Sequence, residues 1–261
     1  MVKTAEINGF EMDYAVFGNS KKAFVILPGI SLKSVTKSAD AVAEAYKQFS
    51  DEYSIYIFDP VRKPHEGYTI KKMADDTALV MKSLGIKDAV IFGASQGGMA
   101  TLQIAVDYPE LAGKIIVGSS MARENEKSAE FLGKMSALAK QGKTDELTEY
   151  FADMVYSENT LGLYRDVIIS GSRDFSKEEL ERFTVMADAC KGFNVYDELE
   201  KIKCPVLVLG SEGDKVLSPQ ASEEIAEKLG CEIYMYDESY GHCVFDEAAD
   251  YKDRIMKFIT E

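Results

Sequence analysis

The sequence has few of the residues from which metal sites and disulfide scaffolds are built. Its 261 residues include two histidines and four cysteines, and no two of the cysteines form a Cys-x-x-Cys pair. Without a secretory segment, cysteines in this number and spacing indicate reduced thiols. No apolar run has the length of a signal segment or a membrane span. We therefore expect a cytoplasmic protein that needs neither disulfides nor a metal.

Positive charge is also scarce. The chain carries 44 Asp and Glu residues against 30 Lys and Arg, which gives a formal net charge of −14. A surface of this sign repels nucleic-acid phosphates and anionic lipid headgroups, so we expect neither nucleic acid nor a membrane as a partner. The stretch Gly93-x-x-x-Gly97-Gly98 lacks the Gly-x-Gly opening of a dinucleotide-binding loop, and no phosphate-binding loop is present, so no cofactor is expected.

The chain does have a regular alternation of two patterns. Short apolar runs bounded by turn residues are typical of strands buried on both faces of a parallel sheet, and segments with apolar residues at three-and-four spacing predict helices. An antiparallel strand pair around Asn8-Gly9 precedes them. The runs are 23–27, 54–58, 88–92, 114–118, 205–209 and 232–236, and the helical segments are 38–49, 70–84, 97–107, 219–229 and 246–259. The alternation predicts a mostly parallel sheet with helices on both faces.

One long stretch breaks this alternation. Residues 121–194 show no good strand pattern, only helical patterns such as 128–140, 144–156 and 177–191. Roughly seventy residues are too many for a connecting loop. We predict a helical cap at 121–194, inserted into a core made of 1–120 and 195–261, with its lower face over a site built by the strand ends.

The sharpest local motif is Gly93-Ala94-Ser95-Gln96-Gly97, which directly follows one apolar run and directly precedes a helical segment. Gly-x-Ser-x-Gly at a strand-to-helix junction is typical of a nucleophile elbow. Side chains at Gly93 and Gly97 would collide with the neighbouring strand and helix. Ser95 is thereby pushed out above the sheet, at the positive end of a helix that favours a developing oxyanion. Ser95 is the predicted nucleophile.

A serine nucleophile needs a base, and a neutral imidazole needs an acceptor that holds its tautomer. Of the two histidines, only His242 lies late enough for the chain order nucleophile, acid, base, so His65 is expected to be a loop residue. The predicted acid is Asp214, because Gly213 before it allows the chain to turn back toward His242. Glu212 on the same loop is the alternative.

These motifs, in this order, resemble the α/β-hydrolase superfamily. The resemblance spans nearly the whole chain and implies an α/β-hydrolase fold, with an eight-stranded, mostly parallel sheet and a cap after the sixth strand. It also implies an oxyanion hole made of the backbone N–H groups of Gln96 and Ile30. The loop Pro28-Gly29-Ile30 departs from the family's frequent His-Gly, but backbone donors do not depend on the missing side chain.

The resemblance implies acyl transfer to water through a triad of Ser95, His242 and Asp214. The expected reaction is hydrolysis of small or medium acyl esters by way of an acyl-enzyme, with a small-molecule ester as the partner. Carbon–carbon bond hydrolases and acyl thioesterases share the fold and the residues, and a non-catalytic small-molecule receptor is the alternative outside enzymology. The oligomeric state is left open, with a homodimer as one alternative.

Overall fold

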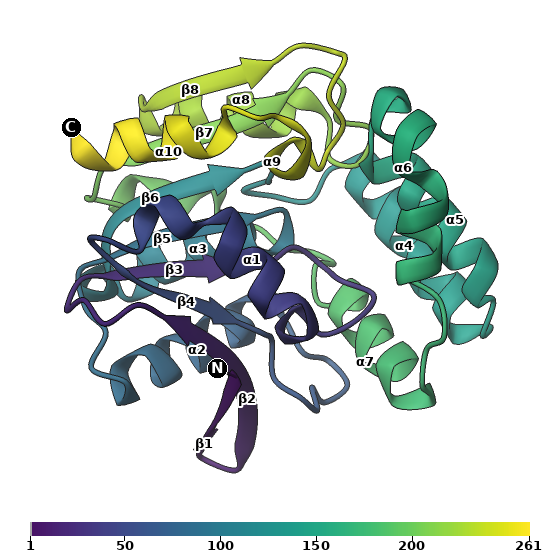
Figure 1. Cartoon of the computed structure of the whole chain (residues 1–261), viewed down its shortest axis with the longest axis horizontal. Helices are drawn as coiled ribbons and strands as arrows, with labels where there is room; N and C mark the ends of the chain where they lie inside the picture. Colours follow the sequence, from purple (N-terminus) through teal and green to yellow (C-terminus); the bar gives the residue numbers. More distant parts are fainter. Residues whose placement is uncertain (1) are drawn as a thin grey trace.

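An eight-stranded sheet forms the centre of the protein, which a computed structural model describes for residues 2–261 (Figure 1). The strands are β1 (Val2–Ile7), β2 (Phe10–Phe17), β3 (Ala23–Leu27), β4 (Ser54–Phe58), β5 (Ala89–Ala94), β6 (Ala112–Gly118), β7 (Val206–Ser211) and β8 (Glu232–Tyr236). Their order across the sheet is β1-β2-β4-β3-β5-β6-β7-β8. The pairs β1 with β2 and β2 with β4 are antiparallel, and all the other pairs are parallel. The predicted fold class is confirmed.

The most apolar strands lie in the middle of this sheet. Every residue of β3, β5 and β7 is buried, because helices cover both faces there. The edge strands β1 and β8 instead alternate exposed and partly buried residues along most of their length. Continuous apolar runs thus mark strands covered on two sides, and alternating ones mark the edges.

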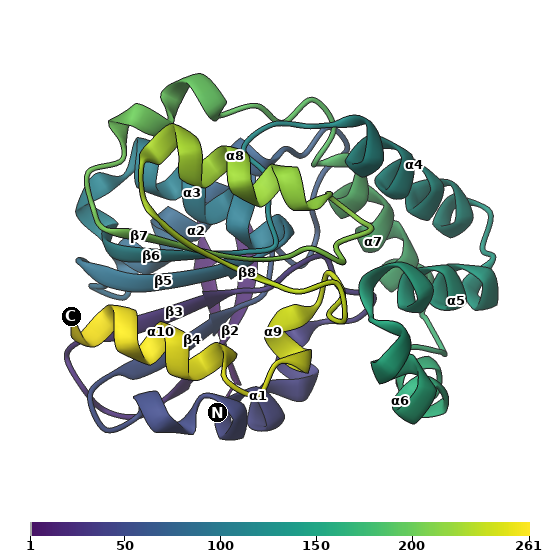
Figure 2. The same ribbon diagram turned by 90° about the horizontal axis from the view of Figure 1, so that it is seen from above.

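Helices cover the two faces of the sheet in two separate layers (Figure 2). On one face lie α1 (Ala39–Ala45) and α10 (Tyr251–Thr260), and on the other lie α2 (Ile70–Ser83), α3 (Gln96–Asp107) and α8 (Pro219–Leu229). Each layer has its own hydrophobic core. Phe24 of β3 packs in the first core and its neighbour Val25 in the second, because side chains alternate across a strand.

Two of the expected helices differ from the structure. The segment 38–49 is the short helix α1 flanked by 3-10 turns at Val35–Ser38 and Lys47–Phe49. The segment 246–259 is divided into α9 (Val244–Glu247) and α10. The division falls at the buried Ala248, whose extended backbone (ψ 121°) ends α9. This turn carries Tyr251 into the core beneath the sheet.

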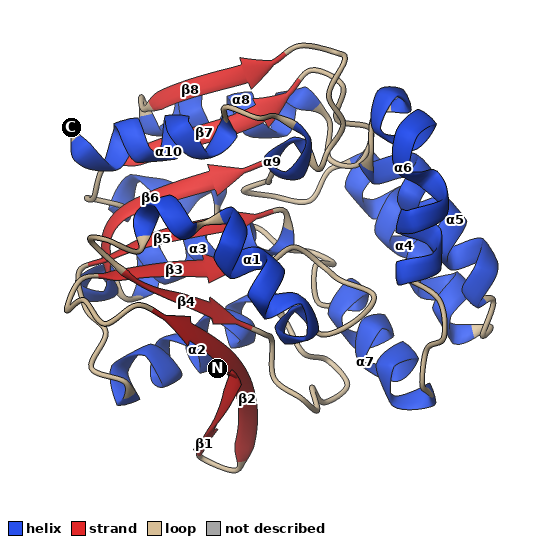
Figure 3. Cartoon of the chain, in the orientation of Figure 1, coloured by secondary structure: helices blue, strands red, loops and turns tan. Residues whose placement is uncertain are grey.

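Between β6 and β7 the described chain forms four α-helices, which we call the helical insertion. They are α4 (Glu126–Lys140), α5 (Thr144–Val155), α6 (Glu158–Gly171) and α7 (Lys177–Asp188). The insertion lies beyond the carboxyl ends of the parallel strands, and Figure 3 shows it as helices and loops. The chain enters and leaves it side by side, because Arg123 and Asn194 form an antiparallel bridge. This bridge lies close to the predicted boundaries 121 and 194.

Local capping explains where two of these helices begin. Asn125 and Ser128 form a capping box at the start of α4, and Ser176 and Glu179 form another at the start of α7. Each box satisfies backbone N–H groups that have no partner within the helix.

In the part of the chain that the structure describes, no helix is both long and apolar enough to cross a membrane.

Helix α3 is pressed against the end of β3 at Gly97. A Cβ atom at Gly97 would overlap the carbonyl group of Leu27 and lie 2.6 Å from the carbonyl oxygen of Pro28. Backbone does not give way as the end of a flexible side chain does, so only glycine fits at this position. This contact fixes how close the start of α3 comes to the loop that follows β3.

We predict that Gly97→Ala lowers the free energy of unfolding by about 3 kcal/mol, because the methyl group overlaps backbone atoms. The matched control is Gly133→Ala in the middle of α4, where an added Cβ atom meets nothing within 4 Å. That control should raise stability by about 0.5–1 kcal/mol through its better helix propensity. Urea unfolding followed by circular dichroism measures both, and equal effects of the two substitutions would contradict the prediction.

Candidate active site

Ser95 occupies the turn between β5 and α3 in a strained backbone conformation. Its φ is 52° and its ψ is −119°, a region that residues with a side chain seldom adopt. The neighbouring chain holds this conformation. The Ser95 N–H donates to the carbonyl of Gly118 (2.8 Å), and the Ser95 carbonyl accepts from the Ser120 hydroxyl (2.8 Å) and from the N–H of Gly98 (2.9 Å).

The glycines of the motif permit this tight turn. A Cβ atom at Gly93 would overlap the carbonyl of Gly97 and the hydroxyl of Thr101. One at Gly98 would lie 2.5 Å from the Cβ atom of Ser120. The predicted reason for Gly93 and Gly97, close approach of strand and helix, agrees with this packing.

His242 and Asp214 form a buried pair. The Nδ1 atom of His242 lies 2.8 Å from Oδ2 of Asp214, and the two side chains are 4% and 1% exposed. A neutral imidazole that donates from Nδ1 to a carboxylate keeps its Nε2 atom as a proton acceptor. The structure therefore brings together the two residues that the sequence predicted as base and acid.

The second oxygen of Asp214 is held as firmly as the first. Its Oδ1 atom accepts the backbone N–H groups of Val216 (2.8 Å) and Leu217 (2.9 Å). Burial alone would raise the pKa of Asp214, but His242 and these two amides outweigh burial and lower it. The carboxylate is thus kept ionised and oriented toward His242.

The loop around Gly213 explains why Asp214 rather than Glu212 reaches the histidine. A Cβ atom at Gly213 would overlap the carbonyl of Tyr240 and lie 2.8 Å from that of Glu238. The Ser211 hydroxyl also donates to the Tyr240 carbonyl (2.6 Å). The two loops therefore pack against each other, with Asp214 inside and the side chain of Glu212 exposed to solvent.

Ser95 and His242 line one cavity of about 590 Å³, which lies between the strand ends and the helical insertion. The loop after β3 forms part of its wall. A Cβ atom at Gly29 would lie 3.2 Å from the Cβ atom of Ser95, so this loop passes directly beside the serine. Ile30 lines the cavity as well, together with Phe131, Phe151 and Val155 from the insertion.

Gln96 and His65, the other two residues considered in the sequence analysis, take different positions. Gln96 is buried at the start of α3, where its side-chain amide donates to the carbonyl of Met186 (2.7 Å) and to the thiol of Cys190 (3.1 Å). His65 lies in an exposed loop with Nδ1 next to the carbonyl of Glu66, and it is not part of the cavity wall. It is a loop residue, as expected.

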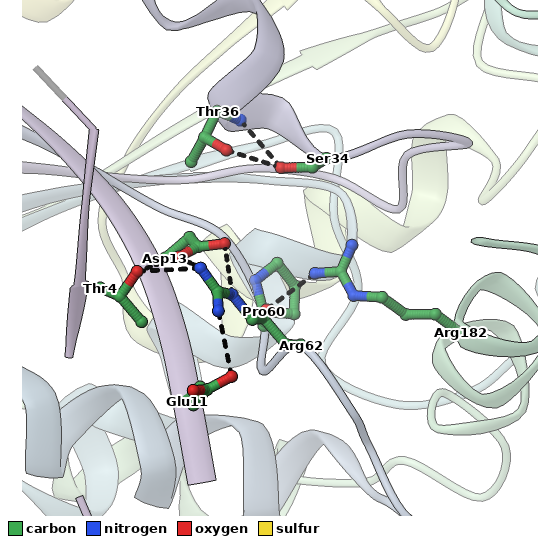
Figure 4. Close-up of polar contacts among 8 residues, drawn as sticks. All are labelled: Thr4, Glu11, Asp13, Ser34, Thr36, Pro60, Arg62 and Arg182. Atoms are coloured by element: carbon green, nitrogen blue, oxygen red, sulfur yellow. Dashed lines mark hydrogen bonds and ion pairs between the residues drawn. The ribbon is translucent and has the colours of Figure 1, made fainter. Parts of the chain in front are cut away.

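Hydrogen bonds that no sequence pattern predicted attach helix α7 to the core. Arg182 donates to the carbonyls of Pro60 (2.7 Å) and Val61 (3.2 Å), which follow β4. Figure 4 shows this arginine reaching Pro60 while Arg62, on the other side of the turn, binds Asp13 and Glu11 of β2. The turn after β4 is thus held on one side by β2 and on the other by the insertion.

A second connection, through Glu247 of α9, joins the insertion to the loop that carries His242, which we call the histidine loop. Its Oε1 atom accepts the N–H of Ser157 (2.7 Å), and its Oε2 atom accepts the N–H of Gly241 (2.6 Å). The N–H of Cys243 in turn donates to the carbonyl of Val155 (2.8 Å). The segment that carries His242 is therefore bonded to the junction between α5 and α6. Only a long-range contact identifies Glu247, so no local sequence pattern could have found it.

Among residues 2–261, no three His, Cys, Asp or Glu side chains are grouped as metal ligands would be. The four cysteines are free thiols. Burial raises the pKa of the Cys190 thiol to about 12, which disfavours the thiolate that nucleophilic chemistry requires.

The cavity also holds a carboxylate, Asp246, which is accessible from the cavity itself. Burial by the surrounding protein raises the pKa of Asp246 to about 6, Lys252 lowers it in part, and Glu247 raises it further. Above about pH 6 the folded protein carries this charge against the cost of burial. Below the unfolded-state pKa of about 4, the residue is neutral in both states and the cost is absent.

We predict that Asp246→Asn raises the Tm by about 2–4 °C at about pH 7.5, which corresponds to about 1 kcal/mol once solvent access through the cavity is allowed for. The gain should disappear below about pH 4. Scanning calorimetry across this pH range measures it, with Asp166→Asn on the exposed side of α6 as the matched control. A gain that is independent of pH would contradict the assignment to the Asp246 charge.

The sequence of this chain is similar to a known protein family and to individual proteins. The model of a family described as alpha/beta hydrolase fold matches residues 23–249. The 3-oxoadipate enol-lactonase 2 of Acinetobacter baylyi is 21% identical over 223 residues, which are 84% of this chain and 81% of that protein.

Solved structures show the same fold. An alpha/beta hydrolase enzyme from a Medee basin deep-sea metagenome library has a TM-score of 0.89 at 22% identity, covering 99% of this chain and 98% of its own. The enol-lactonase from Burkholderia xenovorans LB400 has a TM-score of 0.86 at 20% identity, covering 99% of this chain and 100% of its own.

Proposed function

Because the chain belongs to the α/β-hydrolase family, we propose that it is a serine hydrolase of small or medium acyl esters. The observation that carries the proposal is the shared cavity. The strained Ser95 and His242 both line it, and Asp214, from a third loop, binds the Nδ1 atom of His242. Nucleophile, base and orienting carboxylate are the set that acyl transfer to water requires.

In the proposed first half-reaction, His242 Nε2 takes the proton of the Ser95 hydroxyl while Oγ bonds to the ester carbonyl carbon. The tetrahedral intermediate then expels the alcohol, which leaves with the proton from His242, and the acyl group stays on Ser95. In the second half-reaction, water gives a proton to His242 and attacks the acyl carbon. The acid departs, and the proton returns to Ser95.

The proposed oxyanion donors are the backbone N–H groups of Gln96 and Ile30. Gln96 is the first residue of α3, where an N–H has no partner within the helix and the helix dipole favours negative charge. Gly29 lies against Ser95, which brings the amide of Ile30 to the same side of the cavity. Two preorganised donors of this kind stabilise the charge that develops on the carbonyl oxygen.

We also propose that the helical insertion is the cap predicted at 121–194. Its aromatic side chains Phe131 and Phe151 line the cavity across from the strand ends. A cavity of about 590 Å³ with an apolar wall suits a small or medium acyl group. The similarity to proteins named enol-lactonases supports ester chemistry, since a lactone is a cyclic ester.

Replacing the nucleophile gives the direct test. We expect Ser95→Ala to fold normally but to lose turnover of p-nitrophenyl esters by about a thousandfold or more, and to lose labelling by a fluorophosphonate probe. Ser172→Ala is the matched control, because Ser172 lines the same cavity. Labelling of Ser95 without turnover would favour a receptor or a different hydrolase, and undiminished turnover by Ser95→Ala would exclude the mechanism.

The acid is tested by a pair of substitutions on one loop. We expect Asp214→Asn to lower kcat by about ten-thousandfold, because an amide no longer holds the imidazole in the required tautomer. Glu212→Gln, at an exposed position two residues earlier, should keep nearly full activity. Steady-state kinetics on one ester compare the two, and the reverse ranking would move the role to Glu212.

A further inference from the structure

One part of the cavity wall has an excess of positive charge, although the protein as a whole carries a net charge of −14. Lys33 and Lys37 both line the cavity that contains Ser95 and His242. Both belong to the loop after β3, the same loop whose Gly29 lies beside Ser95. Positive charge in a strongly acidic protein is concentrated here beside the proposed nucleophile.

A carboxylate on α7 faces the two lysines. The ammonium group of Lys37 lies 2.6 Å from Oε1 of Glu179 on α7. Burial raises the pKa of Glu179, but the contacts with Lys37 and the Ser176 amide, together with the charge of Lys33, lower it overall. Glu179 is therefore an anion that neutralises one ammonium group, and Lys37 takes it.

Lys33 is left without an anion of its own. Within residues 2–261, its ammonium group has no carboxylate at ion-pair distance, and the aromatic ring of Phe175 lies 5.9 Å away. The side chain is half-buried, so water solvates it less than a surface lysine. A half-buried ammonium group that faces a ring and a cavity is suited to receive an anion from a ligand.

The backbone that carries Lys33 is held in place by hydrogen bonds within its own loop. The Ser31 hydroxyl donates to the Lys33 carbonyl (2.6 Å). Figure 4 shows the Ser34 hydroxyl between the hydroxyl and the N–H of Thr36, at 2.7 Å and 3.3 Å. Lys33 follows Gly29 by four residues, which span at most about 14 Å, and it lines the same cavity as Ser95.

The other charged group of the cavity does not neutralise Lys33. The charge of Asp246 acts on Tyr46, Tyr156 and Cys243, and the cation that lowers its pKa is Lys252. Among the residues that the structure describes, no ion pair joins Asp246 to Lys33, and the cation acting on Asp246 is Lys252.

We propose that Lys33 is a specificity-determining residue that selects acyl groups ending in a carboxylate, so that monoesters of dicarboxylic acids are favoured substrates. The inference rests on the proposed ester hydrolysis. The ammonium group binds the distal carboxylate while the ester carbonyl lies at Ser95.

The test compares two esters of equal chain length, the p-nitrophenyl monoester of adipate and p-nitrophenyl hexanoate. We expect the wild-type protein to show a higher kcat/KM for the adipate ester. Lys33→Gln should lower the ratio of the two kcat/KM values about tenfold, the usual effect of losing one charge-assisted contact, while the hexanoate ester is unaffected. The control is Lys177→Gln, an exposed lysine of α7 that does not line the cavity.

Glu179→Gln gives a second, opposite expectation. It removes the anion that pairs with Lys37 and whose charge also acts on Lys33, while glutamine still suits the capping position of α7, so the ratio should rise severalfold. A ratio that Lys33→Gln leaves unchanged, or equal losses on both esters, would overturn the inference.

Failure of the proposed function would look different. In that case neither ester would be hydrolysed faster by the wild-type protein than by Ser95→Ala. Calorimetric titration with adipate and with hexanoic amide would then test Lys33 alone. Tighter binding of adipate that is lost in Lys33→Gln supports the anion site, and equal binding of adipate by both proteins excludes it.

Discussion

The contact between Gly97 and the carbonyls of Leu27 and Pro28 is the constraint on which the site depends. It brings the start of α3 against the end of β3, so that two segments far apart in the chain share one corner of the sheet. Ser95 is forced into its strained turn at this corner, and Gly29 passes beside it. The residues proposed as oxyanion donors and the lysine proposed to bind a carboxylate all lie on the two segments that this contact joins. A larger residue at position 97 would push these two segments apart and so displace the proposed oxyanion donors and the lysine at the same time.

The local patterns of the sequence predicted the sheet, most helices and the position of the helical insertion, because burial on two faces and amphipathic spacing leave a trace in neighbouring residues. The pairing of His242 with Asp214 was expected from chain order, and the structure places the two atoms 2.8 Å apart. Helix α6 was not predicted separately. Its exposed Leu163, Tyr164 and Val167 put apolar residues on the outer face, which obscures amphipathic spacing.

What the sequence could not supply are the contacts between distant segments. Arg182 binds the carbonyl of Pro60, Gln96 binds that of Met186, and Glu247 joins Ser157 to Gly241. Each is a polar residue whose partner is decided by tertiary packing, and no short motif marks it. The contacts also differ in what they hold. Those of Arg182 and Gln96 fasten α7 to the core, whereas that of Glu247 fastens the junction of α5 and α6 to the histidine loop.

This last attachment restricts the route by which a molecule can enter. Glu247 and the hydrogen bond from Cys243 to Val155 connect the junction of α5 and α6 to the segment that carries His242. An outward movement of this junction would therefore pull the imidazole away from Ser95, so an opening on this side would disrupt the proposed catalytic residues. An opening at the boundary between the loop after β3 and the start of α7 would not displace His242. An ion pair between Lys37 and Glu179 crosses it, and a pair whose lysine side chain is 61% exposed contributes about 1 kcal/mol or less. A molecule that enters between the loop after β3 and α7 would leave the pair of His242 and Asp214 undisturbed.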